Sequence, residues 1–122
     1  MIHYALPTTA DLLELGAPRA DALSIYLTTD PTPAGRDLAF TTAKSAVDEA
    51  IRALRAAGRS HAEQEWLRTQ WDVVAEDSEL WGNLASSLAI FIAPDFIDEY
   101  VLPNSFEAHT HLGSRFDVGQ PI

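Results

Sequence analysis

Residues 80–94 read LWGNLASSLAIFIAP, and this stretch decides the fold. A turn that contains a tryptophan opens it, an unbroken apolar run follows, and Pro94 ends the run. An apolar run of strand length between turn residues is typical of a strand that is buried on both faces. We therefore predict a strand over 87–93 in the middle of a sheet.

The segments on either side of this run predict three more strands. Leu23, Ile25 and Leu27 alternate with smaller or polar residues, which is typical of a strand with one strongly buried face. A turn after Pro94 leads to a return strand over 97–102. A last strand is expected between 108 and 118, interrupted near a glycine.

A short first helix is expected before the first strand. Thr8 or Thr9 can cap its N-terminus, and Asp11 lies in its first turn. Gly16 is expected to end the helix in the left-handed conformation. The apolar side chains expected to pack against the body of the domain are Leu12, Leu13 and Leu15.

Three further helical segments lie between the first and second strands. Residues 36–57 place apolar side chains three and four apart, and Gly58 ends this helix. Ser60 and Glu63 have capping-box spacing and open the next helix. A short helical turn is expected over 78–84.

The order is helix-β-α-α-β-β-β, which predicts an α+β fold. It consists of a mixed sheet of about four strands packed with three to four helices. A chain of 122 residues forms a single domain, residues 1–122. Residues 116–122 end on an apolar residue directly after proline, without a polar tail. We expect the chain to be the N-terminal domain of a longer multidomain protein.

The composition excludes several classes of function. The formal net charge is −10, and residues 69–114 contain no lysine or arginine against eight acidic residues. Nucleic-acid affinity depends on cations that neutralise phosphates, so we expect no direct nucleic-acid binding from residues 69–114. The absence of cysteine excludes disulfides and thiolate zinc sites. No signal peptide or membrane-spanning run is visible, and we expect a soluble cytoplasmic protein without membrane association.

Two histidines are the first candidates for a site. His109 and His111 are two residues apart in an expected strand, so their side chains share a face. They could supply two imidazole ligands to zinc, but a structural zinc ion takes four ligands. We favour two surface histidines on an edge strand, and we predict no metal and no cofactor. With Arg115, they form a candidate binding site for a small ligand.

Trp81 is the other candidate binding residue. It precedes a Gly-Asn turn, and an exposed tryptophan is typical of a contact surface. The acids at the predicted hairpin turn, Asp95, Asp98 and Glu99, match no calcium-loop spacing and are interpreted as solvated. The sequence has no Gly-x-Ser-x-Gly elbow and no phosphate-binding glycine loop. We therefore predict no catalytic residue in this chain.

The order of these features resembles the N-terminal domain of the bacterial archaeo-eukaryotic release factor family. Those proteins are similar to the class-I translation termination factors of archaea and eukaryotes. The sequence departs from the family pattern at Ser87, where glycine is usual, and at 82–85, where the family has a polar segment with histidine or glutamine. Four segments carry the resemblance: 12–15 with 23–29, the helix 36–57 after a Pro-Gly loop, 80–92 with 100–103, and 115–118.

The resemblance implies a role in translation, ribosome rescue or a related stress response. The partner would be the ribosome or a ribosome-associated protein, bound through the full-length protein. The Gly-Gly-Gln, Asn-Ile-Lys-Ser and Tyr-Cys motifs of true factors are absent, so no functional residue transfers to a position here. Two alternatives remain: a small-ligand-binding or hydrolase-like domain with a pocket near His109, His111 and Arg115, and a structural oligomerisation domain that uses Trp81. The sequence leaves the oligomeric state open.

Overall fold

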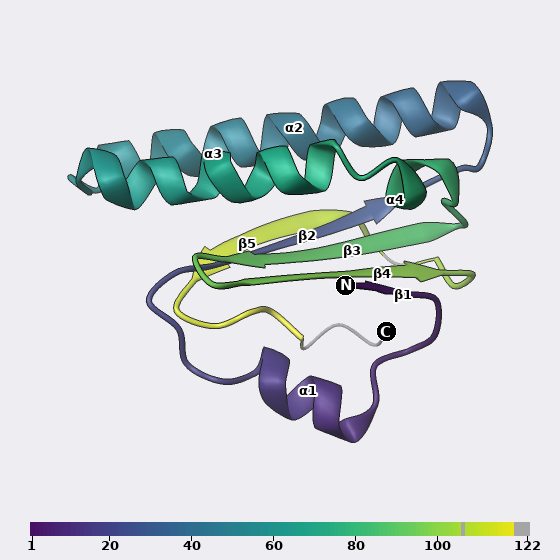
Figure 1. Cartoon of the computed structure of the whole chain (residues 1–122), viewed down its shortest axis with the longest axis horizontal. Helices are drawn as coiled ribbons and strands as arrows, with labels where there is room; N and C mark the ends of the chain where they lie inside the picture. The colour runs from purple at the N-terminus through teal and green to yellow at the C-terminus, as the bar shows by residue number, and fades with distance from the viewer. Residues whose placement is uncertain (106, 119–122) are drawn as a thin grey trace.

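The computed structural model describes residues 1–105 and 107–118. In this part of the chain, four helices flank one mixed sheet of five strands in the order β1-β4-β3-β2-β5 (Figure 1). The strands are β1 (Ile2–His3), β2 (Ala22–Thr28), β3 (Ser87–Ala93), β4 (Phe96–Leu102) and β5 (His109–Gly113). The helices are α1 (Thr9–Leu15), α2 (Pro33–Ala56), α3 (His61–Ala75) and α4 (Ser78–Gly82).

The α+β class and the mixed sheet are confirmed, with one strand more than the four expected. The additional strand is β1, which pairs in parallel with β4 through Ile2 opposite Glu99 and His3 opposite Tyr100. All other strand pairs are antiparallel. A two-residue strand is too short to show an alternating pattern, so the sequence carries no signal for it. The apolar end of the chain, on which we based the expectation of a longer protein, includes residues 119–122, and these lie outside the described residues.

The helices divide unequally between the two faces of the sheet. Figure 1 shows α2, α3 and α4 above the sheet and α1 alone below it. Beneath the three helices lies a mainly aliphatic core that includes Ile25, Val47, Leu67 and Ile90. A second buried cluster lies on the α1 face and includes the rings of Tyr26, Phe91, Tyr100 and Phe116. We call these two sides the helix face and the α1 face.

The central strand is placed as predicted. β3 is the third of five strands, and all seven of its residues are buried. The prediction for β2 was wrong in one respect, because Ala22, Ser24 and Tyr26 are as fully buried as the residues that alternate with them. A second buried cluster on the α1 face covers these side chains.

Local side-chain hydrogen bonds set the start of α3. The Ser60 Oγ accepts from the Glu63 amide at 3.2 Å, and the Glu63 Oε1 accepts from the Ser60 amide at 3.0 Å. The hydrogen bond from the Ser60 backbone, reinforced by Arg59, lowers the pKa of Glu63 to about 2. Gly58, just before this cap, has a φ of 78° in the left-handed region, as expected where α2 ends. The capping-box prediction is confirmed.

The first helix corrects two expectations. Gly16 has a φ of −77°, so it ends α1 in the right-handed region. Leu15 is buried, but Leu12 and Leu13 are exposed to 40% and 74%. The helix has only seven residues, about two turns, so few of its side chains can point toward the sheet. Leu15 is therefore the one side chain of α1 that is fully buried.

The acids near the hairpin are also placed differently from the prediction. Asp95 is exposed in the turn, but Asp98 and Glu99 belong to β4 and point to opposite faces of the sheet. Glu99 is only 3% exposed on the helix face, and burial raises its pKa against the opposing effect of the Met1 amine. No helix in the described residues is long and apolar enough to cross a membrane.

Candidate functional site

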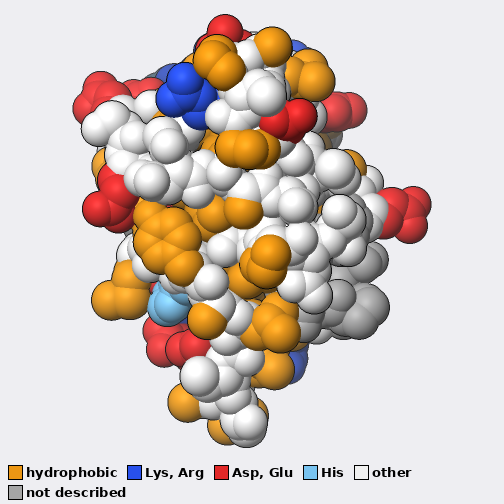
Figure 2. Space-filling view, turned by 90° about the vertical axis from the view of Figure 1, so that its right-hand side faces the viewer, with side chains coloured by type: hydrophobic (Ala, Val, Ile, Leu, Met, Phe, Trp, Pro, Cys, Tyr) orange, Lys and Arg blue, Asp and Glu red, His pale blue; other side chains and the backbone are white. Residues whose placement is uncertain are grey.

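A groove opens where the helical layer meets α4. It has a volume of about 430 Å³ and lies between the first turns of α2, the end of α3 and α4. Figure 2 shows the molecule from this end, where hydrophobic side chains form a broken band from the helical layer down to α1. The groove is lined by Arg36, Asp37, Phe40, Ala75, Glu76, Ser78, Trp81 and Gly82.

Trp81 forms the aromatic wall of this groove. Asp77 caps α4 by accepting from the amides of Glu79 at 3.2 Å and Leu80 at 3.3 Å. The indole Nε1 of Trp81 donates to the Val74 carbonyl at 2.9 Å, which fixes the ring. The ring remains partly exposed, as predicted, so it offers a rigid apolar surface.

Two further rings support Trp81. The Phe40 and Trp81 ring centroids are 5.1 Å apart in an edge-to-face arrangement, and Trp71 approaches Trp81 at 6.2 Å. Trp71 belongs to the buried core, whereas Phe40 is partly exposed beside the groove. The aromatic wall is therefore continuous with the core, and little motion is left to it.

Arg36 brings a cation to this aromatic wall. From the sequence it is one of four basic residues of the central helix that could contact RNA, and the sequence favours a solvated face for them. It lies in the first turn of α2, directly after the Thr32 cap, whose hydroxyl accepts from the Gly35 amide at 3.1 Å. Its Nε atom is buried and makes no hydrogen bond within the described residues. The side chain as a whole is partly exposed, and no hydrogen bond or ion pair joins its terminal nitrogens to another described residue, so these donors can serve a carbonyl or carboxylate oxygen of a bound partner. The Pro-Gly loop before Arg36 was the only sequence signal for its position.

His109 lies elsewhere, on the α1 face of β5, and its ring is fully engaged. It stacks on Tyr26 with 4.6 Å between ring centroids and 12° between planes. Its Nε2 is 3.0 Å from the Asp117 Oδ2, and its Nδ1 is 3.3 Å from the Glu107 carbonyl. Both ring nitrogens therefore have protein partners.

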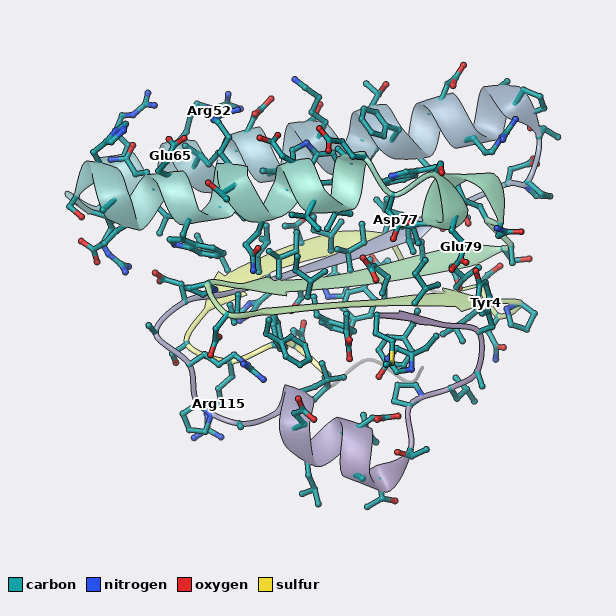
Figure 3. All side chains as sticks on the ribbon, in the orientation of Figure 1. Tyr4, Arg52, Glu65, Asp77, Glu79 and Arg115 are labelled. Carbon is teal, nitrogen blue, oxygen red and sulfur yellow. The ribbon has the colours of Figure 1, made fainter. Side chains whose placement is uncertain are left out.

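His111 and Arg115 come after His109 in the sequence, but the described contacts do not connect the three side chains to one another. His111 is exposed and lies opposite Ser24 in the strand register, on the same face as His109. The Arg115 Nη1 donates to the Gly16 carbonyl at 3.2 Å, just past the end of α1. Figure 3 shows Arg115 on the opposite side of the sheet from α4 and toward the other end of the molecule. The predicted residues thus fall into two separate regions, Trp81 in one and the other three in the second.

The second region holds no metal-binding cluster. Within residues 1–105 and 107–118, no group of three or more histidine, aspartate or glutamate side chains is placed to hold a metal ion. A related arrangement at the other sheet edge was not foreseen: His3 stacks on Tyr100 at 4.3 Å, and its Nε2 is 3.2 Å from the Asp98 Oδ2. Each edge strand therefore carries a histidine held between a tyrosine ring and an aspartate.

Sequence comparisons add no family assignment to this geometry. No model of a known protein family matches the chain, and no curated protein matches it in sequence. The release-factor resemblance consequently stays a prediction. The best-defined candidate site is the groove of Arg36 and Trp81, which we call the Trp81 groove.

Proposed function

We propose that this chain is a non-catalytic docking domain that holds a protein partner in the Trp81 groove. The observation that carries the proposal is the juxtaposition, in one groove, of a fixed, partly exposed indole ring with a partly exposed guanidinium that has no hydrogen bond or ion pair to another described residue. Tryptophan and arginine are the residue types most enriched at energetically dominant positions of protein interfaces. An oxygen acceptor on the partner would complete the hydrogen bonding of Arg36.

The charge distribution supports a protein partner over a nucleic acid. Asp37 and Glu76 line the groove beside Arg36, so the local field is not positive. The chain as a whole carries a formal charge of −10. Phosphate backbones would be repelled by this surface, whereas a peptide segment can offer both a carboxylate or carbonyl and a cation.

The biological setting of the proposal follows from the sequence resemblance. As the N-terminal domain of a release-factor-like protein, the chain would act in the cytoplasm in translation, ribosome rescue or a stress response. Its partner would be the ribosome or a ribosome-associated protein, and the contact would be made through protein rather than RNA. Chemistry, if the full-length protein performs any, would lie in other domains.

Co-sedimentation with ribosomes tests this proposal. We expect the wild-type chain to pellet with purified ribosomes at low salt, and Arg36→Ala to weaken the association about tenfold, because a hydrogen bond from a charged group contributes roughly 1.5–3 kcal/mol. Arg52→Ala is the matched control, because Arg52 is an exposed arginine on the same helix, far from α4 (Figure 3). Circular dichroism checks that each variant is folded.

Three outcomes would overturn the proposal. Failure of the wild-type chain to pellet at low salt would argue against a ribosomal partner. Equal losses for Arg36→Ala and Arg52→Ala would show that general charge, and not the groove, drives the association. If the chain alone sediments as a dimer that Arg36→Ala dissociates, the Trp81 groove serves oligomerisation instead.

A further inference from the structure

The second open feature of the molecule is the edge of the sheet at β5. The sheet ends in β1 on one side and β5 on the other, and β5 pairs only with β2 among the described strands (Figure 1). β1 has two residues, but β5 has five, which is about 17 Å of backbone. An edge strand presents outward N–H and C=O groups that can pair with another chain.

β5 lacks the devices that usually protect such an edge. Its sequence, His-Thr-His-Leu-Gly, contains no lysine or proline. The helices pack on the inner strands, α2 on β2 and α3 on β3, so neither is centred over β5. Within the described residues, the outer edge of β5 is therefore left open to pairing.

A groove runs beside this edge, between α2 and β5. It has a volume of about 280 Å³ and is lined from α2 by Ala46, Glu49, Ala50 and Ala53, and from β5 by Thr110 and Leu112. The short alanine side chains leave room between helix and strand, and Glu49 supplies an exposed carboxylate at the rim. Thr110 and Leu112 face this groove, while His109 stacks on Tyr26 on the opposite face.

We propose that an extended, basic peptide adds to β5 as a sixth strand. Successive side chains of a strand alternate between faces, so every second side chain of the added peptide enters the α2–β5 groove. The groove takes an aliphatic side chain against Leu112 and the alanines, and a lysine or arginine at the rim pairs with Glu49. This surface is distinct from the Trp81 groove, and the inference does not depend on the proposed function.

The charge of the chain decides between a peptide and a second copy of the chain. Each copy carries a net charge of −10, and residues 69–114, which include β5, contain no lysine or arginine. Two copies joined through β5 would bring together two bodies that each carry this net charge, and two Glu49 side chains. A basic peptide neutralises the same groups, so charge complementarity favours it.

Fluorescence anisotropy with a labelled peptide, acetyl-Lys-Thr-Val-Thr-Val-Thr-Lys-amide, tests the proposal. We expect binding that weakens with salt, and at least a tenfold loss for the same peptide methylated on alternate backbone nitrogens, or with both lysines replaced by glutamate. Methylation removes strand donors but keeps every side chain and charge. Hydrogen exchange should show new protection confined to the segment that contains β5.

Matched variants of the protein test whether the peptide binds in the α2–β5 groove. Glu49→Lys should weaken binding about tenfold, whereas Glu65→Lys, on the exposed face of α3, makes the same change of charge and should leave it nearly unaffected. Ala53→Leu fills the groove from an exposed helix position and should also weaken binding. Absence of binding, equal affinity of the methylated peptide, or equal effects of the two lysine variants would overturn the proposal. Concentration-dependent dimers that Ala53→Leu dissociates would show that a second copy is the occupant.

Discussion

The helix face of the sheet is aliphatic and lies under two long helices, whereas the α1 face is built from aromatic rings under one short helix. On the helix face, β3 presents Leu88, Ile90 and Ile92 to a core shared with α2 and α3. On the α1 face, the same strand presents Ala89, Phe91 and Ala93. One strand thus serves two cores of different chemistry.

Small residues on β3 create the space for rings on the α1 face. Ala89 lies opposite Tyr26 on β2 and opposite Tyr100 on β4, so one row across the sheet places a methyl group between two tyrosines. Phe91 approaches both tyrosine rings edge to face, at 5.8 and 5.9 Å. The row continues to His3 and His109 at the two edges, each stacked on its tyrosine. On the α1 face the sheet itself contributes rings, whereas on the helix face it contributes aliphatic side chains and the rings come from the helices.

Removing Phe91 is the strongest way to break the α1 face. We expect Phe91→Ala to lower the free energy of unfolding by about 4 kcal/mol, because the ring is fully buried and contacts Tyr26, Tyr100 and Phe116. Ile90→Ala removes a buried neighbour from the helix face and should lower it by about 3 kcal/mol. Urea denaturation at constant pH measures both values. A Phe91→Ala loss below 1 kcal/mol would contradict a well-packed aromatic core.

The covering of the α1 face by α1 should depend on one side chain. Leu15 is 1% exposed and Leu13 is 74% exposed. We expect Leu15→Ala to cost about 3 kcal/mol and Leu13→Ala less than about 0.5 kcal/mol. Both variants remove the same side chain from the same helix, so helix propensity cannot explain a difference between them. Equal losses in urea denaturation would show that α1 is held by another contact.

The helix face could be predicted from sequence because its signals are local. The apolar run over 87–93, the spacing in α2 and the Ser60 capping box each depend on residues within a few positions of one another. The prediction of a short helical turn before β3 succeeded for the same reason, since Asp77 caps the residues that follow it. The central place of β3 followed from its burial alone, whereas the sequence left the order of the strands open.

The α1 face could not be predicted because its contacts join distant residues. β1 exists only through its pairing with β4, where the Glu99 amide donates to the Met1 carbonyl at 2.9 Å, and no local pattern signals this. The burial of Tyr26 and Ser24 depends on the segment after β5, whose Asp117 amide donates to the Ser24 Oγ at 2.9 Å. From the sequence, Arg36 is interpreted as part of a solvated helix face, because its place beside Trp81 follows only from the fold.

Glu99 is a buried carboxylate among the apolar side chains of the helix face. Its substitution is expected to change the free energy of unfolding less than the losses expected for Phe91→Ala, Ile90→Ala and Leu15→Ala. Its carboxylate is buried opposite Ile90, and its Oε2 is 3.5 Å from the Met1 amine but makes no hydrogen bond in the described residues. Burial raises the pKa of Glu99, and Asp77 and Asp98 add to the rise. The folded state therefore holds the proton more tightly than the unfolded state does.

Because the pKa of Glu99 is higher in the folded state than in the unfolded state, its ionisation lowers stability as the pH rises above the ordinary glutamate pKa of about 4.3. Glu99→Gln cannot ionise, so its stability relative to wild type should increase between pH 4 and pH 7, on the order of 1 kcal/mol. Glu107→Gln makes the same change at an exposed position and should show no such trend. Urea denaturation of the three proteins across this range measures the effect. A Glu99→Gln variant that loses stability relative to wild type as the pH rises would mean that the Met1 amine outweighs burial.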